Sequence, residues 1–289
     1  MNNTRILIAG ATGQQGGTVV DALVGSGHTI LGLTRNPDSE KSQALAARGV
    51  TVVKGNLQDG IGLSEALHQV DSFFFMTTPF EAGIDAETEQ GINAVDAAKE
   101  AGIRHVVFSS VADADKETGV PHFDSKYRVE QHLRASGVPF TILAPAFFYD
   151  NMMAPFVLPG LQDGTLAQAL PAEVKLQSVS ARNIGEFAAL ALLNPDRFVG
   201  RRIDFAGDEL TGPEYAQVIG RVGGKDIGYY EVPLEQIRSA SEDMALMYDW
   251  FSRVGYSADI PSLKNEYPEV KWERFSQWAD RQDWGVLST

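Results

Sequence analysis

Three glycines near the start of the chain have the spacing of a phosphate-binding turn. Gly10, Gly13 and Gly16 directly follow the apolar run Ile6–Ile8, and apolar residues at helical spacing follow them. Between a strand and a helix, Gly10 would allow the sharp turn, Gly13 would leave room for a pyrophosphate, and Gly16 would let the helix pack closely. The first amides of such a helix attract phosphate. The context therefore favours a dinucleotide-binding turn over an ordinary glycine-rich loop.

The end of the second predicted strand, 29–34, indicates which dinucleotide would bind. Folds that prefer NAD usually place Asp or Glu there, to bind the ribose 2′-hydroxyl. This chain has Thr34 followed by Arg35, and a guanidinium suits a 2′-phosphate. We therefore expect NADP(H) rather than NAD(H). Lys41, one turn into the next predicted helix, either adds charge at this site or is an ordinary exposed lysine.

The elements that must position these residues alternate along the chain. Further strands are predicted at 50–54, 71–76, 104–108 and 138–143, with helical patterns between them. This alternation predicts a doubly wound parallel α/β sheet. We expect a Rossmann domain over 1–153, rejoined by about 178–206. Residues 154–177 and 207–289 are expected to form a smaller, mainly helical lobe that covers the cofactor cleft, without strands after Gly207.

Residues at the carboxyl ends of parallel strands are candidates for cofactor contact, because ligands of doubly wound sheets bind there. The aromatic and Met-rich stretch after the sixth strand would line an apolar pocket beside the nicotinamide, or would be plain core. The predicted cofactor-binding residues are Gly10, Thr12, Gly13, Gln14, Gln15, Gly16, Arg35, Lys41, Asn56, Leu57, Thr77, Thr78, Pro79, Ser109, Lys126, Pro145, Phe147 and Phe148.

Composition excludes several classes of function. The 289 residues include no cysteine, which rules out disulfides, thiolate metal sites and a cysteine nucleophile. The five histidines lack metal-ligand spacing, so no metal site is expected. No stretch has the length of a membrane span and no signal pattern is visible, so we expect a cytoplasmic protein without membrane contact. A net charge of −14 argues against direct nucleic-acid binding.

Taken in order, these motifs resemble the NmrA-like family, a branch of the atypical short-chain dehydrogenase/reductase superfamily. The matching segments are Gly10–Gly16, Thr34–Pro37, Gly55–Asp59, His122–Lys126 and Pro145–Asn151. The resemblance covers nearly the whole chain and implies a Rossmann domain that binds NADP(H). It implies one of two activities: redox sensing through a regulatory protein partner, or NADPH-dependent reduction of small molecules such as quinones.

One departure from the superfamily pattern concerns catalysis. Ordinary members use Tyr-x-x-x-Lys on the helix that here carries Lys126, with Tyr as the proton donor and Lys holding the nicotinamide ribose. In this chain His122 stands where that Tyr would be. Tyr127 adjoins Lys126 and would project about 100° away on a helix. Ser109 or Ser110 resembles the superfamily's serine, but lacks its Tyr partner.

The catalytic alternatives therefore stay open at this point. His122 would donate the proton itself, or would cap or pack at the helix start. Lys126 would bind the ribose or, as in isoflavone-reductase-like proteins, act as the acid/base group. The complete cofactor site beside an incomplete catalytic one favours an NADP(H) sensor. The alternative is an NADPH-dependent oxidoreductase that reduces a quinone, aldehyde or other conjugated carbonyl, with a small aromatic or carbonyl compound as its substrate.

Overall fold

The computed structural model describes residues 3–58 and 60–288; the side chains of 60, 61 and 288 lie outside the description. The chain divides into two compact units, each built from separate segments. Unit 1 comprises 1–115, 122–144 and 181–203, and unit 2 comprises 116–121, 145–180 and 204–289.

Unit 1 is organised around a seven-stranded sheet whose last strand, β10, runs across the unit boundary. The order is β10-β6-β5-β4-β1-β2-β3, and the neighbouring pairs from β3 through to β6 are parallel. The strands are β1 (Arg5–Ala9), β2 (Thr29–Thr34), β3 (Thr51–Lys54), β4 (Ser72–Met76), β5 (His105–Ser109), β6 (Phe140–Pro145) and β10 (Arg202–Phe205). The order reverses direction between β1 and β4, which is the switch point where doubly wound sheets bind ligands.

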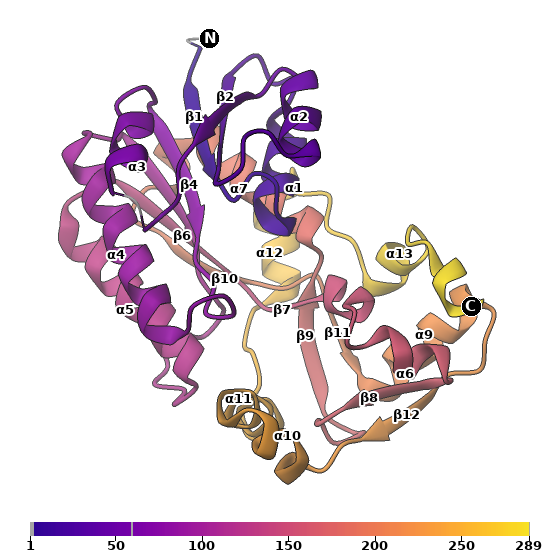
Figure 1. Cartoon of the computed structure of the whole chain (residues 1–289). Helices are drawn as coiled ribbons and strands as arrows, with labels where there is room; N and C mark the ends of the chain where they lie inside the picture. Colours follow the sequence, from indigo (N-terminus) through magenta and orange to yellow (C-terminus); the bar gives the residue numbers. More distant parts are fainter. Residues whose placement is uncertain (1–2, 59, 289) are drawn as a thin grey trace. The chain divides into compact units, whose positions relative to one another are not determined.

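Helices cover both faces of this sheet (Figure 1). They are α1 (Gln14–Leu23), α2 (Glu40–Ala47), α3 (Gly60–Leu67), α4 (Ile84–Glu100), α5 (Pro121–Ser136), α7 (Ala181–Leu193) and α8 (Pro195–Phe198). α1 and α7 pack against each other so closely that a Cβ on Gly185 would lie 2.4 Å from the backbone of Thr18. That approach is possible only because α7 has a glycine at the crossing.

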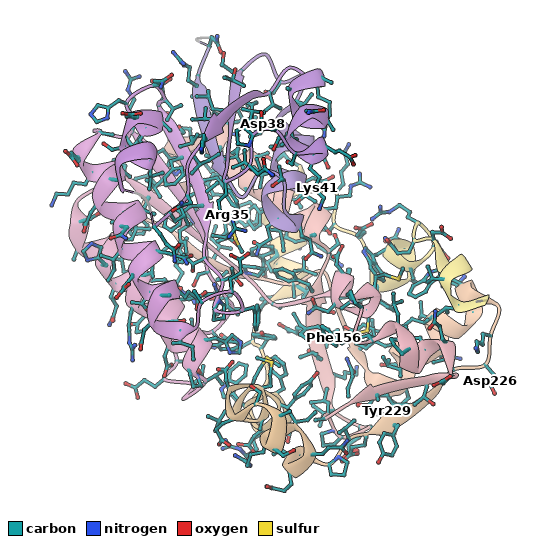
Figure 2. The ribbon with its side chains drawn as sticks, viewed as in Figure 1. Arg35, Asp38, Lys41, Phe156, Asp226 and Tyr229 are labelled. Atoms are coloured by element: carbon teal, nitrogen blue, oxygen red, sulfur yellow. The ribbon has the colours of Figure 1, made fainter. Side chains whose placement is uncertain are left out.

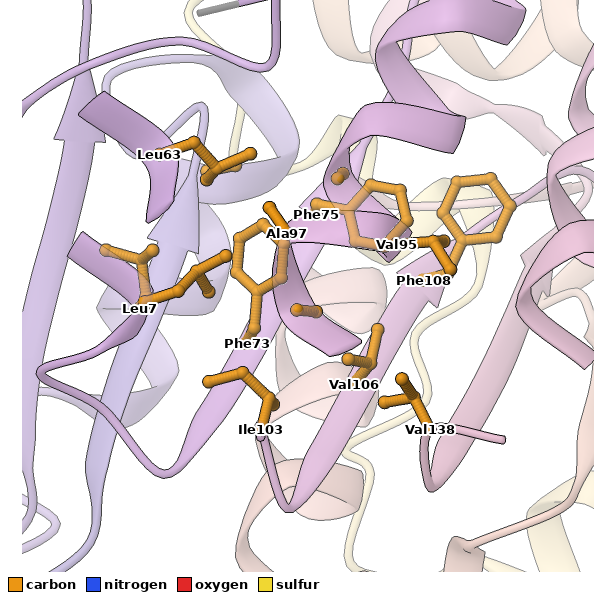
Figure 3. Close-up of a cluster of buried hydrophobic side chains, with 14 of the residues drawn as sticks. Leu7, Leu63, Phe73, Phe75, Val95, Ala97, Ile103, Val106, Phe108 and Val138 are labelled. Carbon is orange, nitrogen blue, oxygen red and sulfur yellow. The ribbon is translucent and has the colours of Figure 1, made fainter. Parts of the chain in front are cut away.

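The other face of the sheet packs against α3, α4 and α5 through large apolar side chains (Figure 3). Phe73, Phe75 and Phe108 have no exposed surface, and the rings of Phe75 and Phe108 stack with centroids 4.7 Å apart. These side chains come from alternate positions of two adjacent strands, the periodicity expected of one sheet face. Burying each such side chain stabilises the fold by roughly 1.5–3 kcal/mol. This core fixes the strand ends that carry the candidate site.

Unit 2 has its own sheets and core. The three-stranded sheet has the order β11-β9-β7, and β12 pairs with β8 in a second sheet. Its strands are β7 (Phe147–Phe148), β8 (Thr165–Gln168), β9 (Lys175–Val179), β11 (Asp208–Thr211) and β12 (Gly228–Glu231). Its helices are η1 (Tyr149–Met153), α6 (Leu158–Gln162), α9 (Gly212–Gly223), α10 (Leu234–Ala240), α11 (Glu242–Arg253), α12 (Ile260–Glu266), α13 (Phe275–Ala279) and η2 (Trp284–Ser288).

The aromatic residues of the C-terminal region form the core of unit 2. Tyr149, Tyr215, Phe275 and Trp278 are buried together, and the rings of Phe275 and Trp278 stack at 5.2 Å. α9 begins with a reciprocal cap between Thr211 and Glu214, and the chain after it turns at Gly224 with φ +63°.

The structure corrects three sequence predictions. Two strands, β11 and β12, follow Gly207, where only helices were expected. The strand that ends at Val179 belongs to the sheet of unit 2, although β10 does join the large sheet as predicted. The sequence also offers Asp124 as the cap of a helix that runs to about Ala135, whereas α5 already begins at Pro121, so Asp124 lies inside its first turn. Proline suits the first position of a helix, where its missing amide costs nothing.

Candidate functional site

The glycine turn after β1 has the backbone geometry that its sequence predicts. Gly10 has φ +65°, and the amide of Gly13 donates to the carbonyl of Gly10 at 2.8 Å. A Cβ on Gly16 would lie 2.3 Å from that same carbonyl oxygen, and one on Gly13 would lie 3.2 Å from it. The sharp turn at Gly10 and the close packing at Gly16 are therefore confirmed, since contact at 2.3 Å excludes any side chain.

The start of α1 suits an anion. The first bond of the helix runs from the Gly17 amide to the Gly13 carbonyl at 2.9 Å, so three earlier amides, those of residues 14–16, precede it. Gly13 has no side chain to cap them, and the first turn has no acidic residue. Gly13 and Gln14 are exposed, and Thr12 and Gln15 are half-buried. The amides and the positive end of the helix dipole thus face no competing carboxylate on α1.

Arg35, at the end of β2, is paired with Glu81 from the segment between β4 and α4. Its Nη1 lies 2.6 Å from Oε2 of Glu81 and its Nη2 lies 3.1 Å from Oε1, a two-pronged contact. Both side chains are exposed, at 68% and 55%. The hydrogen bonds and charge of Glu81 raise the pKa of Arg35 above its usual value. Figure 2 labels Arg35 and also Lys41, which is exposed on the first turn of α2.

Lys126, on α5, is held at the end of β4 by a buried carboxylate. Its Nζ lies 2.6 Å from Oε1 of Glu87 and 2.8 Å from the carbonyl oxygen of Thr77. Glu87 has no exposed surface, and its oxygens also accept hydrogen bonds from the hydroxyls of Thr77 and Ser125. Both oxygens of this buried carboxylate therefore accept hydrogen bonds, as burial of a charge requires. The arrangement fixes the ammonium of Lys126 at the carboxyl edge of the sheet.

His122 lies in the first turn of α5, one turn before Lys126. Its side chain is 7% exposed and its ring meets that of Phe123 edge-on at 4.8 Å. The ring of Phe80 lies 6.4 Å away and is itself 76% exposed. His122 therefore packs against Phe123 and also lies beside the exposed ring of Phe80.

Two serines at the end of β5 have different partners. Ser109 donates to Oε1 of Gln15 at 2.7 Å, which ties β5 to the first turn of α1. Ser110 donates to Glu130, whose other oxygen is 2.8 Å from Nε of Arg202. Burial raises the pKa of Glu130, and the charge of Arg202 opposes that rise. This second buried ion pair braces α5 against β10.

The remaining predicted residues divide between the two units. Asn56 accepts from the Gln58 amide at 2.7 Å, and Leu57 packs on the edge of the unit 1 core. Thr78 accepts a long bond from the Phe80 amide, and the Pro79 carbonyl accepts from Gly83. The other three, Pro145, Phe147 and Phe148, belong to unit 2.

In the aromatic and Met-rich stretch after β6, two of the residues expected to line a pocket are instead part of a hydrophobic core. Tyr149 and Met152 are buried in the core of unit 2, whereas Phe147 and Phe148 are half-buried in β7. The ring of Phe147 meets that of Phe251 edge-on at 6.3 Å.

The spacing Tyr-x-x-x-Lys does occur once in the sequence, at Tyr267–Lys271 in unit 2. This stretch has no helical structure and contains Pro268, so the two side chains do not share a helix face. Tyr267 is fully buried and its hydroxyl donates to Glu266 at 2.9 Å. The pair therefore lacks the geometry of the superfamily's catalytic Tyr and Lys.

Sequence reasoning missed both carboxylates of the site. Glu87 lies on the face of α4 that buries Gly91, Ala94 and Ala98, and a charge on an apolar stripe is a detectable signal. Glu81 lies in an exposed segment, 46 residues from Arg35, and has no such signal.

Across residues 3–58 and 60–288, no group of three or more His, Cys, Asp or Glu side chains is arranged to hold a metal ion. Within that same part of the chain, none of the helices combines the length and apolar character needed to cross a bilayer.

The fold and this edge of the sheet define a doubly wound nucleotide-binding class of protein. The model of the NmrA-like family matches residues 2–279, so the chain belongs to the NmrA-like family. The resemblance found in the sequence motifs is thereby confirmed.

Three proteins show what this chain is similar to. Quinone oxidoreductase 2 of Escherichia coli is 27% identical over 244 residues, which cover 83% of this chain and 82% of that protein. The triphenylmethane reductase of Citrobacter sp., solved with NADP(H), superposes with a TM-score of 0.79 at 24% identity over 96% of this chain and 99% of that one. NmrA, a negative transcriptional regulator solved with NADP, superposes with a TM-score of 0.81 at 20% identity, over 99% of this chain and 100% of that one.

Proposed function

We propose that this protein binds NADP(H) at the carboxyl edge of the unit 1 sheet and senses the redox state of that dinucleotide. The observation that carries the proposal is the uncapped start of α1 behind the Gly10–Gly16 turn. Amides that precede the first helical bond attract the diphosphate of a dinucleotide. Two structural neighbours solved with NADP or NADP(H) support this assignment.

The 2′-phosphate of NADP(H) is assigned to Arg35. This side chain is exposed at the end of β2, where the adenosine ribose of a dinucleotide lies in this class of fold. A guanidinium binds phosphate oxygens with two parallel hydrogen bonds, the geometry that Arg35 already makes with a carboxylate. Lys41 adds a second positive charge on the next helix.

Sensing is preferred to turnover because of the groups around Lys126. Tyr127 is the one tyrosine in the sequence of unit 1, and it is not four residues before Lys126. The ammonium of Lys126 is committed to Glu87 and to the Thr77 carbonyl, which suits holding a ribose better than passing a proton. A carbonyl reductase without a general acid loses a factor of about 10²–10⁴ in rate.

A second candidate function, an NADPH-dependent reductase, is favoured by one specific observation. His122 lies one helical turn before Lys126 and beside the exposed ring of Phe80. Bound NADPH would supply a hydride, and a histidine positioned beside the substrate is a common proton donor. Quinones, aldehydes and other conjugated carbonyls are the substrates to test, and the quinone oxidoreductase relative supports that choice.

The two candidates are separated by following NADPH oxidation with a panel of quinones, aldehydes and conjugated ketones. Sensing predicts that NADPH binds and that its oxidation stays at the rate without protein for every compound. It also predicts that NADP⁺ and NADPH give different amide hydrogen-exchange patterns. Steady oxidation that is lost in both His122→Ala and Lys126→Ala, with binding of NADPH retained in His122→Ala, would establish the reductase instead.

A further inference from the structure

The Arg35–Glu81 ion pair spans the end of the strand that leads into the glycine turn. Arg35 follows β2 and Glu81 follows β4, and β1 lies between these strands in the sheet. Two strand spacings, roughly 10 Å, separate β2 from β4. The two side chains meet by reaching toward each other above the carboxyl end of β1. That is the edge along which the proposed function lays the dinucleotide.

Glu81 uses the donors that a 2′-phosphate would need. Both Nη atoms of Arg35 point at the Glu81 carboxylate, at 2.6 and 3.1 Å. A phosphate seeks the same planar pair of N–H groups. The phosphate carries roughly two negative charges and would lie next to the negative charge of Glu81. Like charges at this distance repel. The carboxylate and the 2′-phosphate therefore exclude each other at this face of the guanidinium.

The pair is weak enough to be exchanged. Both side chains are more than half exposed, and ion pairs of this kind contribute little to stability. The segment that carries Glu81 has no regular secondary structure, and its neighbour Phe80 is 76% exposed. Its anchor lies further back, at Thr77, which is buried against Glu87 and Lys126.

We propose that Glu81 is a specificity-determining residue that competes with the 2′-phosphate of NADP(H) for Arg35. NADP(H) must displace the Glu81 carboxylate in order to bind, whereas NAD(H), which has no 2′-phosphate, leaves the pair in place. Glu81 thus weakens the binding of NADP(H) without changing that of NAD(H). This inference rests on the proposed function, because it assumes that the dinucleotide lies along this edge.

The test is calorimetric titration of the full chain and of Glu81→Gln with NADPH and with NADH, at low ionic strength. Glu89→Gln is the matched control, because Glu89 is exposed on α4 and its loss changes the net charge equally. We expect Glu81→Gln to tighten NADPH binding about two- to five-fold, the range that an exposed ion pair gives. The NADH constant stays unchanged, and so do both constants in Glu89→Gln.

Two further titrations identify the mechanism. In an Arg35→Gln background the same Glu81→Gln change has a clearly smaller effect on NADPH binding, because no guanidinium remains to compete for and only the direct repulsion between Glu81 and the phosphate is relieved. At high salt the gain from Glu81→Gln shrinks, because salt screens the exposed pair.

Contrary results would be as specific. If Glu81→Gln weakens the binding of either dinucleotide, then Glu81 is a ligand, for example of the ribose hydroxyls, and the competition is refuted. If NADPH binds the wild type while Glu81→Gln and Glu89→Gln behave alike, the competition is refuted as well. Absence of NADPH binding to the wild-type chain would refute the proposed function itself.

Discussion

Nζ of Lys126 lies 2.6 Å from Oε1 of Glu87, a carboxylate with no exposed surface. The contact joins α5 to α4 and fixes both helices at the end of β4, where Thr77 completes the set of hydrogen bonds. The superfamily lysine is thus part of the structural core of unit 1 as well as a candidate cofactor contact. The two roles are separable by experiment.

Lys126→Met is expected to destabilise the protein by about 3–5 kcal/mol, because it leaves a buried carboxylate without its cation. Urea denaturation followed by circular dichroism measures the change. The double variant Lys126→Met/Glu87→Gln is the control, because it removes the charge that was left unpaired. It should recover a large part of the loss. A single variant that costs less than about 1 kcal/mol would show that water reaches Glu87 and that the pair is not a buried one.

Gly16→Ala is expected to destabilise unit 1 and to abolish NADPH binding, because its Cβ would meet the Gly10 carbonyl oxygen at 2.3 Å. Gly17→Ala is the matched control on the same helix, with its nearest atom at an ordinary 3.5 Å. It should be neutral or stabilise by up to about 1 kcal/mol, since alanine favours a helix. Thermal denaturation and NADPH titration of the two variants check this. Equal behaviour would contradict the account of the turn.

Arg35→Gln is expected to weaken NADPH binding about tenfold or more and to leave NADH binding nearly unchanged. A hydrogen bond to a charged group contributes about 1.5–3 kcal/mol, and only NADPH has the phosphate that makes it. Lys41→Gln removes a neighbouring exposed charge and is expected to have the smaller effect. An equal loss for both dinucleotides in Arg35→Gln would mean that the guanidinium acts on the shared diphosphate instead.

His105 makes stability depend on pH in a predictable direction. Burial at the start of β5 lowers the pKa of His105 to about 4, and its Nε2 is 2.8 Å from Thr141. Thr141 donates to the Phe198 carbonyl, so Nε2 carries the proton and Nδ1 is the orphaned buried atom. In the unfolded chain the pKa of His105 is about 6.5. Below that pH the unfolded chain binds a proton at His105, whereas the folded chain does not until the pH nears 4. Stability therefore falls as the pH drops from about 6.5 towards 4.

The slope from this one group approaches about 1.4 kcal/mol per pH unit between those limits. Urea denaturation of the wild type and of His105→Gln at pH 7.5 and pH 5 isolates it, because other groups titrate in both proteins. The wild type should lose more stability between the two pH values than the variant does. A parallel loss in both proteins would show that His105 is protonated in the folded state as well.

The sequence contains enough to predict unit 1 and the backbone of its glycine turn. Short apolar runs that alternate with helical patterns locate the strands. The three glycines at fixed spacing predict a turn without room for side chains, and at Gly16 this is confirmed, because a Cβ there would lie 2.3 Å from the Gly10 carbonyl oxygen. The sequence places the start of α5 less well, because Asp124 resembles a helix cap while Pro121 is the better signal for a first helical residue.

Long-range pairing explains what the sequence did not predict. β12 is four residues long and pairs with β8, more than 60 residues earlier, so no local pattern marks it as a strand. Arg35 was assigned a role from its place after β2, but its partner comes from a different crossover. Glu87 was detectable as a charge on the buried face of α4, yet only the fold shows that Lys126 neutralises it.

The account rests on a dinucleotide diphosphate at the start of α1 with the 2′-phosphate on Arg35, and a crystal structure of the protein in saturating NADPH tests it most directly. We expect density for phosphate oxygens about 2.7–3.2 Å from the amides of Gln14–Gly16. We also expect Arg35 turned from Glu81 to the 2′-phosphate. NADPH bound elsewhere, or an empty groove at saturation, would contradict the account.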